Sequence, residues 1–162
     1  TGAGVPVTTI GKVGDLFAGR GVTRALPTAS DDDGVTALLG QMAAAPHGLH
    51  FVNLVDFDQQ YGHRNDVEGY ARALEQFDDW LPALEARIDE RDLVILTADH
   101  GCDPTTPSTD HSREYTPLLV FGPNVRAADL GTRKTLSDIG QTVAENFHTH
   151  IEKGSSFFEA IL

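Results

Sequence analysis

The sequence is poor in cysteine and in basic residues. Its single cysteine, Cys102, cannot form a disulfide within the chain, which is typical of a reducing compartment and predicts a cytoplasmic protein. Twelve lysines and arginines stand against twenty-four aspartates and glutamates, so the net charge is −12. This charge argues against nucleic acid or an anionic membrane as a partner. A phosphorylated substrate stays possible, because bound divalent cations reverse the local field of an acidic pocket.

Long apolar runs are also lacking. No stretch approaches the roughly 18 to 20 consecutive apolar residues of a membrane span, and no charged-then-apolar leader is present. We therefore expect a soluble protein that is not exported. With 162 residues, of which 40% are apolar, the chain is long enough for a sizeable core, and we expect residues 1–162 to form one domain.

One short stretch combines a buried strand with residue types that bind metals. Residues 93–98 favour a buried strand, Asp99 and His100 follow at its C-terminal end, and Gly101 lets the backbone turn away. Ligands of open α/β sheets bind at that end of the strands. A carboxylate and an imidazole delivered there together are a candidate metal or catalytic site.

A second stretch repeats this arrangement. Residues 51–58 predict another strand, with Asp58 at its end and His63 in the polar segment that follows. From residue 66 onward apolar residues recur every three or four positions, which predicts a long helix that Pro82 kinks or restarts. This order of strand, loop, helix and strand is a βαβ unit. We therefore expect the two strands to be parallel and near each other, with their C-terminal ends on the same side of the sheet.

A third histidine, His111, lies on the long polar segment 102–115, and an ordered loop of this length usually serves a site. Taken singly, each of these acids and histidines is more often a helix cap or a surface group; their joint placement favours a metal site. Carboxylates with imidazoles suit zinc, manganese or iron, and two such cations about 3.5 to 4 Å apart stabilise a phosphoryl transfer. The five candidate ligands are Asp58, His63, Asp99, His100 and His111.

The remaining pattern completes an α/β fold. Residues 5–12 are β-prone, 13–18 form a short helical turn, and 116–121 predict a further strand. Strands that alternate with helices predict a largely parallel sheet with helices on both faces.

Two further helices have polar starts. The aspartates of 31–33 precede an amphipathic helix, with Asp33 as its cap, and Ser137 with Asp138 caps a later helix. The three aspartates lack the alternating ligand positions and the distal glutamate of a calcium loop. We therefore interpret them as a helix entry and a solvated surface.

Five motifs in order resemble the phosphopentomutases of the alkaline phosphatase superfamily, and the resemblance runs from about residue 5 to residue 162. The motifs are residues 10–19, 53–58 with 61–64, 97–101, 109–117 and 137–143. The resemblance implies an alkaline-phosphatase-like core and an isomerase of nucleoside catabolism. Such an enzyme interconverts the 1-phosphate and 5-phosphate of ribose or deoxyribose, with two manganese ions and a phosphorylated threonine.

The resemblance also implies a role for each candidate residue. Asp58, His63 and His111 would hold one manganese ion, and Asp99 with His100 would hold the other. Lys12 matches a lysine near the substrate phosphate. Cys102 departs from the asparagine expected after the His-Gly pair, which affects a hydrogen bond there rather than the ligands.

Parts of the family pattern precede everything in this sequence. The phosphothreonine, an aspartate that completes the second metal site, and the cap domain all belong to an N-terminal portion. The resemblance therefore implies that the chain is the C-terminal part of the enzyme, with no catalytic nucleophile, one whole metal site and one half-built site. We expect no mutase turnover from the chain alone, and its partner would be the N-terminal portion.

Two alternatives stay open. The chain could be a non-catalytic metal-binding fragment. It could also come from a sister enzyme, such as a metal-dependent phosphoglycerate mutase or a phosphatase. The Asp-Phe-Asp sequence of 56–58 and the Tyr-Gly-His-Arg sequence of 61–64 speak against a sister enzyme.

Overall fold

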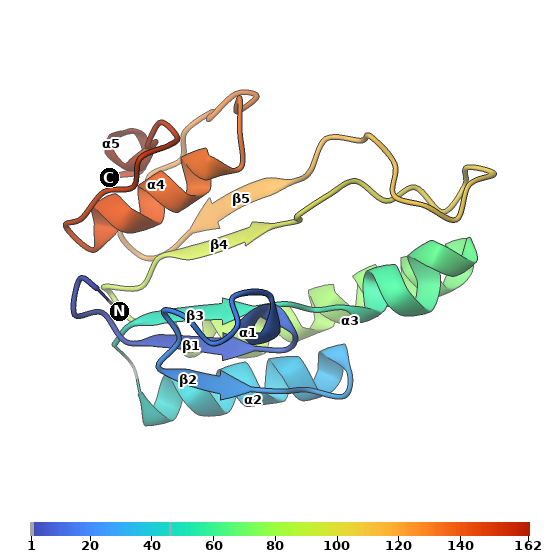
Figure 1. The fold of residues 1–162 in the computed structure, drawn as a ribbon, viewed down its shortest axis with the longest axis horizontal. Coiled ribbons are helices and arrows are strands. Elements are labelled where there is room, and N and C mark those ends of the chain that lie inside the picture. The colour runs from blue at the N-terminus through green and yellow to red at the C-terminus, as the bar shows by residue number, and fades with distance from the viewer. Residues whose placement is uncertain (1, 46) are drawn as a thin grey trace. The chain divides into compact units, whose positions relative to one another are not determined.

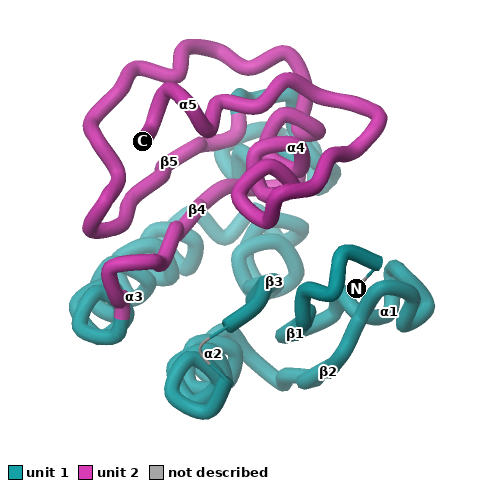
Figure 2. The backbone as a smooth tube through the Cα atoms, turned by 90° about the vertical axis from the view of Figure 1, so that its left-hand side faces the viewer, with its two compact units in different colours: residues 1–87, 100–115 teal, residues 88–99, 116–162 magenta. Residues whose placement is uncertain are grey.

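The computed structural model describes residues 2–45 and 47–162 (Figure 1). The chain divides into two compact units (Figure 2). Unit 1 comprises Thr1–Arg87 and His100–Tyr115, and unit 2 comprises Ile88–Asp99 and Thr116–Leu162. Each unit is therefore built from two separate stretches of sequence, and the single domain expected for residues 1–162 stays a prediction.

Unit 1 contains a three-stranded parallel sheet. Its strands lie in the order β2-β1-β3 and are β1 (Val7–Ile10), β2 (Arg24–Leu26) and β3 (Leu49–Val52). The central strand β1 holds the buried residues Thr8, Thr9 and Ile10, as expected for a strand with neighbours on both sides. Because the strands are parallel, the C-terminal ends of β1 and β3 lie at the same edge of the sheet.

Helices flank this sheet. The short helix α1 (Val13–Leu16) follows β1 directly, and α2 (Asp31–Ala44) lies against β1 and β3. The predicted α/β fold, with a parallel sheet flanked by helices, is confirmed.

The start of α2 differs from the sequence prediction. The N-cap is Ser30 rather than Asp33: Ser30 Oγ accepts a hydrogen bond from the backbone N–H of Asp33 at 3.2 Å. The Asp33 carboxylate instead accepts a hydrogen bond from the backbone N–H of Ala29. Asp31 is not on a solvated surface, since only 6% of it is exposed. A run of three identical acids gave no sign of which one faces inward.

The strand predicted over 51–58 is shorter and lies earlier, because β3 ends at Val52. The backbone N–H of Asn53 makes one last hydrogen bond to Ile10 O, after which the chain leaves the sheet. It then forms a π-helix, η1 (Phe57–Tyr61), and a 3₁₀ helix, η2 (Gly62–Arg64). Short π-helical turns are frequent at functional sites.

The long helix expected after residue 66 is α3 (Val67–Glu85), capped by the Asp66 carboxylate, which accepts a hydrogen bond from the backbone N–H of Gly69. Pro82 neither ends nor restarts α3, since it lies in the last turn, where few further hydrogen bonds depend on it. The rings of Tyr70 and Phe77 meet Phe57 of η1 edge-on, and so fix η1 against α3. No described helix is long and apolar enough to cross a membrane.

Unit 2 contains an antiparallel strand pair and two helices: β4 (Val94–Thr97), β5 (Leu118–Phe121), α4 (Ser137–Asn146) and α5 (Phe158–Ile161). These two strands confirm the strands predicted from the apolar runs at 93–98 and 116–121. Among the described residues β4 pairs with β5. Because β3 belongs to unit 1, the parallel relation expected between β3 and β4 stays a prediction.

The start of α4 is held by a buried aspartate rather than by a side-chain cap. No side chain caps this helix, so the predicted cap at Ser137 and Asp138 is wrong in form. Instead the Asp138 carboxylate accepts hydrogen bonds from the backbone N–H of Ser155 at 2.8 Å and from Arg133 Nε at 3.0 Å. Thr142, fully buried, donates from Oγ1 to Asp138 O and accepts from the backbone N–H of Phe157. These bonds join α4 to the segment before α5.

Candidate metal centre

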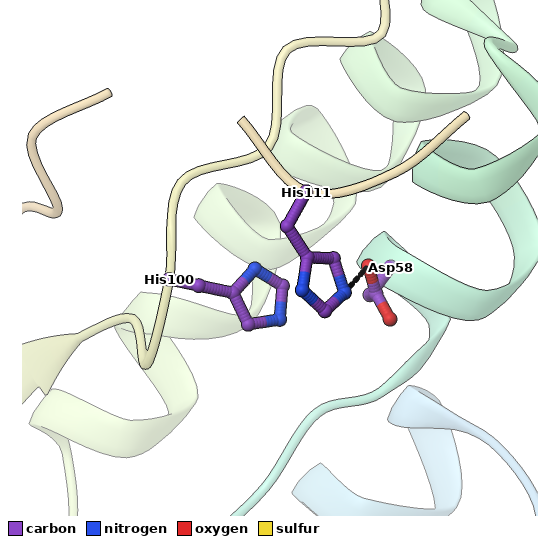
Figure 3. Close-up of side chains that lie close together, drawn as sticks. All are labelled: Asp58, His100 and His111. Carbon is purple, nitrogen blue, oxygen red and sulfur yellow. Dashed lines mark ion pairs between the residues drawn. The ribbon is translucent and has the colours of Figure 1, made fainter. Parts of the chain in front are cut away.

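Four of the five predicted metal ligands lie together in unit 1. Asp58 is on η1 and His63 is on η2, while His100 and His111 lie at the start and near the end of the stretch 100–115. Figure 3 shows the imidazoles of His100 and His111 beside the Asp58 carboxylate. Asp99 is an exposed residue of unit 2, and its part in the site stays a prediction.

The Asp58 carboxylate is the centre of the cluster. Its Oδ2 lies 3.2 Å from His63 Nε2, and its Oδ1 lies 3.4 Å from His111 Nε2. The side chains of His63 and His111 are 42% and 46% exposed, against 28% for Asp58. The carboxylate is thus set deeper than the two imidazoles, which are accessible to solvent.

His100 joins the same group by stacking on His111. Their ring centroids are 3.6 Å apart and the planes differ by 15°. One ligand atom each from Asp58, His100 and His111 lies within 4.8 Å of the others. Two imidazoles and a carboxylate this close suit a transition-metal cation. The stacking also favours uncharged rings, because two imidazolium rings stacked in this way would repel each other.

Backbone carbonyls orient two of the imidazoles. His63 Nδ1 lies 2.6 Å from Thr109 O, and His100 Nδ1 lies 3.1 Å from Gly101 O. When Nδ1 carries the proton and donates to a carbonyl, Nε2 keeps its lone pair for a metal, which is the usual arrangement of a ligating histidine. The Thr109 carbonyl, followed by the negative charge of Asp58, raises the pKa of His63.

A buried oxygen that accepts no hydrogen bond tests the fit of a cation. Asp58 Oδ1 is buried and makes no hydrogen bond. A buried carboxylate oxygen in this position costs free energy unless a cation or a donor meets it. With imidazole nitrogens beside it, the donor set fits a divalent cation such as Mn²⁺ or Zn²⁺.

Two glycines allow the segments to approach this closely. A Cβ on Gly101 would lie 2.7 Å from Glu114 N and 2.8 Å from Ser112 O, and the pair Gly101 and Ser112 forms an isolated antiparallel bridge. The bridge closes the loop and brings His111 back beside His100. A Cβ on Gly62 would lie 2.5 Å from Cys102 Sγ, so η2 also depends on glycine to lie against the loop.

Lys12 lies at the same edge of the sheet. Gly11, at a φ of +89°, lets the end of β1 approach the carbonyl of Asn53 after β3, a contact that a Cβ would block. Lys12 follows, and its Nζ donates a hydrogen bond to Gln59 Oε1 at 2.8 Å. Because Gln59 follows Asp58 directly, this hydrogen bond ties the Lys12 ammonium group to the segment that carries Asp58.

Cys102 is a half-buried free thiol beside η2. Burial, and then the negative charge of Asp58, raises its pKa. The thiol therefore stays protonated at neutral pH and is not activated as a thiolate ligand.

Three contributors to the site had escaped the sequence interpretation. Gln59 holds Lys12, the carbonyl of Thr109 orients His63, and Asp31 is paired with Asp56 just before η1. Gln59 could have been suspected from its place beside Asp58. The other two act through backbone groups, which leave no mark in a sequence pattern.

A family model described as "Metalloenzyme superfamily" matches residues 2–151. The chain belongs to the metalloenzyme superfamily. This membership agrees with the cluster of metal-donor side chains in unit 1.

Curated relatives of this superfamily chain carry a more specific name. A protein named phosphopentomutase from Caldanaerobacter subterraneus subsp. tengcongensis is 52% identical over 161 residues, covering 98% of this chain and 41% of the relative. A phosphopentomutase from Anaeromyxobacter sp. (strain K) is 54% identical over 159 residues, with the same coverages of 98% and 41%. The predicted resemblance to phosphopentomutases is confirmed, and the chain spans about two fifths of these relatives.

Solved structures share the fold. A phosphoglycerate mutase from Leishmania mexicana, crystallised at low cobalt concentration, superposes with a TM-score of 0.69 at 16% identity, covering 94% of this chain and 36% of that one. The PH0037 protein from Pyrococcus horikoshii gives a TM-score of 0.62 at 17% identity, covering 75% of this chain and 38% of that one. At these identities the likeness concerns the fold alone.

Proposed function

We propose that a full-length protein carrying this chain is a cytoplasmic phosphopentomutase of nucleoside catabolism. It would interconvert the 1-phosphate and the 5-phosphate of ribose or deoxyribose. The observation that carries the proposal is 52% identity over 98% of the chain with a relative of that name. The clustered metal donors of unit 1 support it, because phosphoryl transfer is a reaction that paired divalent cations accelerate.

We assign Asp58, His63 and His111 to one Mn²⁺, and Asp99 with His100 to a second. The ligand atoms of Asp58, His100 and His111 lie within 4.8 Å of one another, so two cations divided among these side chains would lie a short distance apart. When bound, these cations would neutralise phosphoryl oxygens and lower the pKa of an attacking hydroxyl. The protein's own contribution is to hold the imidazoles in place through the Thr109 and Gly101 carbonyls.

Lys12 would bind the substrate phosphate. Its ammonium is exposed and held by one neutral amide oxygen, that of Gln59, so it can turn toward an anion without breaking an ion pair. A lysine suits this task because its compact positive charge contacts phosphate oxygens from any direction.

We also propose that the chain has no turnover by itself. The threonine that carries the phosphate, the aspartate that completes the second metal site and the cap that selects the sugar would lie outside the matched 41% of the relatives. The partner of the chain would then be that remaining portion.

The direct test is an assay of a full-length protein carrying this chain, with ribose 5-phosphate and Mn²⁺. We expect conversion to the 1-phosphate, and a loss of at least about 100-fold in kcat for Asp58→Ala and His111→Ala, since each removes a proposed ligand. His150→Ala, which changes an exposed histidine of unit 2, is the matched control and should retain full activity. Absence of conversion by the unmodified protein would contradict the proposal.

Two further arms address the alternatives. Conversion of 3-phosphoglycerate instead of ribose 5-phosphate would identify a sister mutase. Calorimetric titration of Mn²⁺ without turnover would identify a metal-binding protein. Binding that Asp58→Ala and His111→Ala leave unchanged would show that the assigned ligands are wrong.

A further inference from the structure

Two aspartates form a reciprocal pair just before the metal centre. The backbone N–H of Asp31 donates to Asp56 Oδ2 at 2.9 Å, and the backbone N–H of Asp56 donates to Asp31 Oδ1 at 3.0 Å. Each residue thus supplies one donor and one acceptor to the other. Asp31 is the first residue of α2, and Asp56 immediately precedes η1.

The pair joins segments that are 25 residues apart in the sequence. One turn further along α2, Gly34 lies against Leu54, since a Cβ on Gly34 would be 3.1 Å from Leu54 Cδ2. The start of α2 is therefore closely packed against the chain that leaves β3. Asp58 lies two residues after Asp56 in the chain. The position of the Asp56 backbone therefore determines where the Asp58 side chain leaves the chain.

This pairing places the buried Asp31 carboxylate near the half-buried Asp56 carboxylate. Asp31 is only 6% exposed, and burial, with a smaller contribution from the charge of Asp56, raises its pKa. Among the described residues, no lysine or arginine is ion-paired with either carboxylate. The two backbone N–H groups therefore hold these carboxylates in place, against the like charge between them, and the geometry of the pair depends on both segments.

We propose that Asp31 is a positioning residue of the metal centre. Through Asp56 it fixes the start of η1, and so it sets the Asp58 carboxylate at the distance from His63 and His111 at which a divalent cation fits. Asp31 itself touches neither metal nor substrate. The inference rests on the metal-binding part of the proposed function.

A purely structural anchor would behave differently from a positioning residue. Loss of an anchor lowers the unfolding temperature and leaves the affinity of the folded protein for metal unchanged. Loss of a positioning residue weakens the metal affinity of molecules that are still folded, commonly by about 10- to 100-fold for partners of metal ligands. Metal affinity and unfolding temperature must therefore be measured on the same variants.

The test uses a full-length protein carrying this chain, with Mn²⁺ as the probe in calorimetric titrations. Asp31→Ala should weaken Mn²⁺ binding by about 10-fold or more. Asp31→Asn keeps an oxygen that accepts from the Asp56 N–H, and should stay within about 3-fold of the unmodified protein. Asp32→Ala changes the exposed neighbour and should leave the affinity unchanged.

A further variant keeps the inference testable if Asp31→Ala does not fold. Asp31→Glu retains the charge but moves the carboxylate by one methylene, and should also weaken Mn²⁺ binding. Unchanged affinity in folded Asp31→Ala or Asp31→Glu, or an equal loss in Asp32→Ala, would overturn the inference. So would absence of Mn²⁺ binding by the unmodified protein. Tight Mn²⁺ binding without pentose phosphate conversion would contradict only the proposed enzyme activity.

Discussion

Asp31 in unit 1 and Asp138 in unit 2 are both buried and both lie in the first turn of a helix, yet their surroundings are opposite. The Ser155 N–H, and then Arg133, lower the pKa of Asp138. Burial raises the pKa of Asp31, whose partner is another aspartate. The charged form of Asp138 therefore stabilises unit 2, whereas the charged form of Asp31 is disfavoured by its surroundings. The two helix starts therefore differ in the sign with which a buried aspartate contributes to stability at neutral pH.

The largest effect on stability is expected when Asp138, the aspartate with favourable surroundings, is removed. Asp138→Ala takes away the acceptor for the Ser155 N–H and the carboxylate partner of Arg133, which should lower the free energy of unfolding by about 3 kcal/mol. Urea denaturation measures it, with the exposed Glu152→Ala as the control. A loss below about 1 kcal/mol would mean that the pair contributes no more than a surface ion pair.

A packing change in unit 1 gives the next largest effect. Gly62→Ala places a Cβ against Cys102 Sγ and should lower the free energy of unfolding by about 1 to 3 kcal/mol. The double variant Gly62→Ala with Cys102→Ala should recover part of this loss, because the sulfur is gone. If the two single losses simply add in the double variant, the contact is not the cause.

The two aspartates should give stability profiles of opposite sign in acid. The contribution of Asp138 is complete above its ordinary pKa of 3.8 and is lost as the pH falls through its lower folded-state pKa. That of Asp31 is complete below 3.8 and is lost as the pH rises through its raised folded-state pKa.

Unfolding free energies measured from about pH 3 to about pH 7 test these signs. Asp31→Asn should be more stable than the unmodified protein at pH 7, by on the order of 1 kcal/mol, and the gain should shrink in acid. Asp138→Asn should be less stable at pH 7, with a loss that shrinks in acid. Profiles of the same sign would remove the basis of the comparison.

The smallest effect is expected at the exposed contact between Lys12 and Gln59. In a full-length protein, Gln59→Ala should raise the KM for ribose 5-phosphate by about 2- to 3-fold and leave kcat nearly unchanged, because one exposed hydrogen bond contributes about 0.5 kcal/mol or less. Gln60→Ala, at the neighbouring exposed position, is the control. A fall in kcat with unchanged KM would show that Gln59 acts on the chemical step.

The sequence predicted part of the arrangement. The apolar run at 93–98 located β4, and the polar loop after Gly101 brings His111 beside Asp58 and His100 as expected. β3 ends at Val52, so Asp58 lies on η1 and not at the end of a strand. That these side chains bind a metal stays a prediction.

Burial and the exact course of the backbone could not be predicted. Asp31 looked like its two exposed neighbours, since only the tertiary pairing with Asp56 distinguishes it. The segment 53–58 has the residue types of a strand but turns into η1, because Phe57 packs against the rings of α3. Such contacts join residues that are distant in the sequence, and no local pattern contains them.

The bridge between Gly101 and Ser112 determines when the ligand-bearing loop loses its conformational freedom. A loop closed by its own backbone gives up that entropy as the chain folds and not when a cation arrives. A cation held by the proposed ligands would then meet donors that are already ordered, so more of its coordination energy would appear as affinity. Exchange of one divalent cation for another should consequently need no unfolding of the loop.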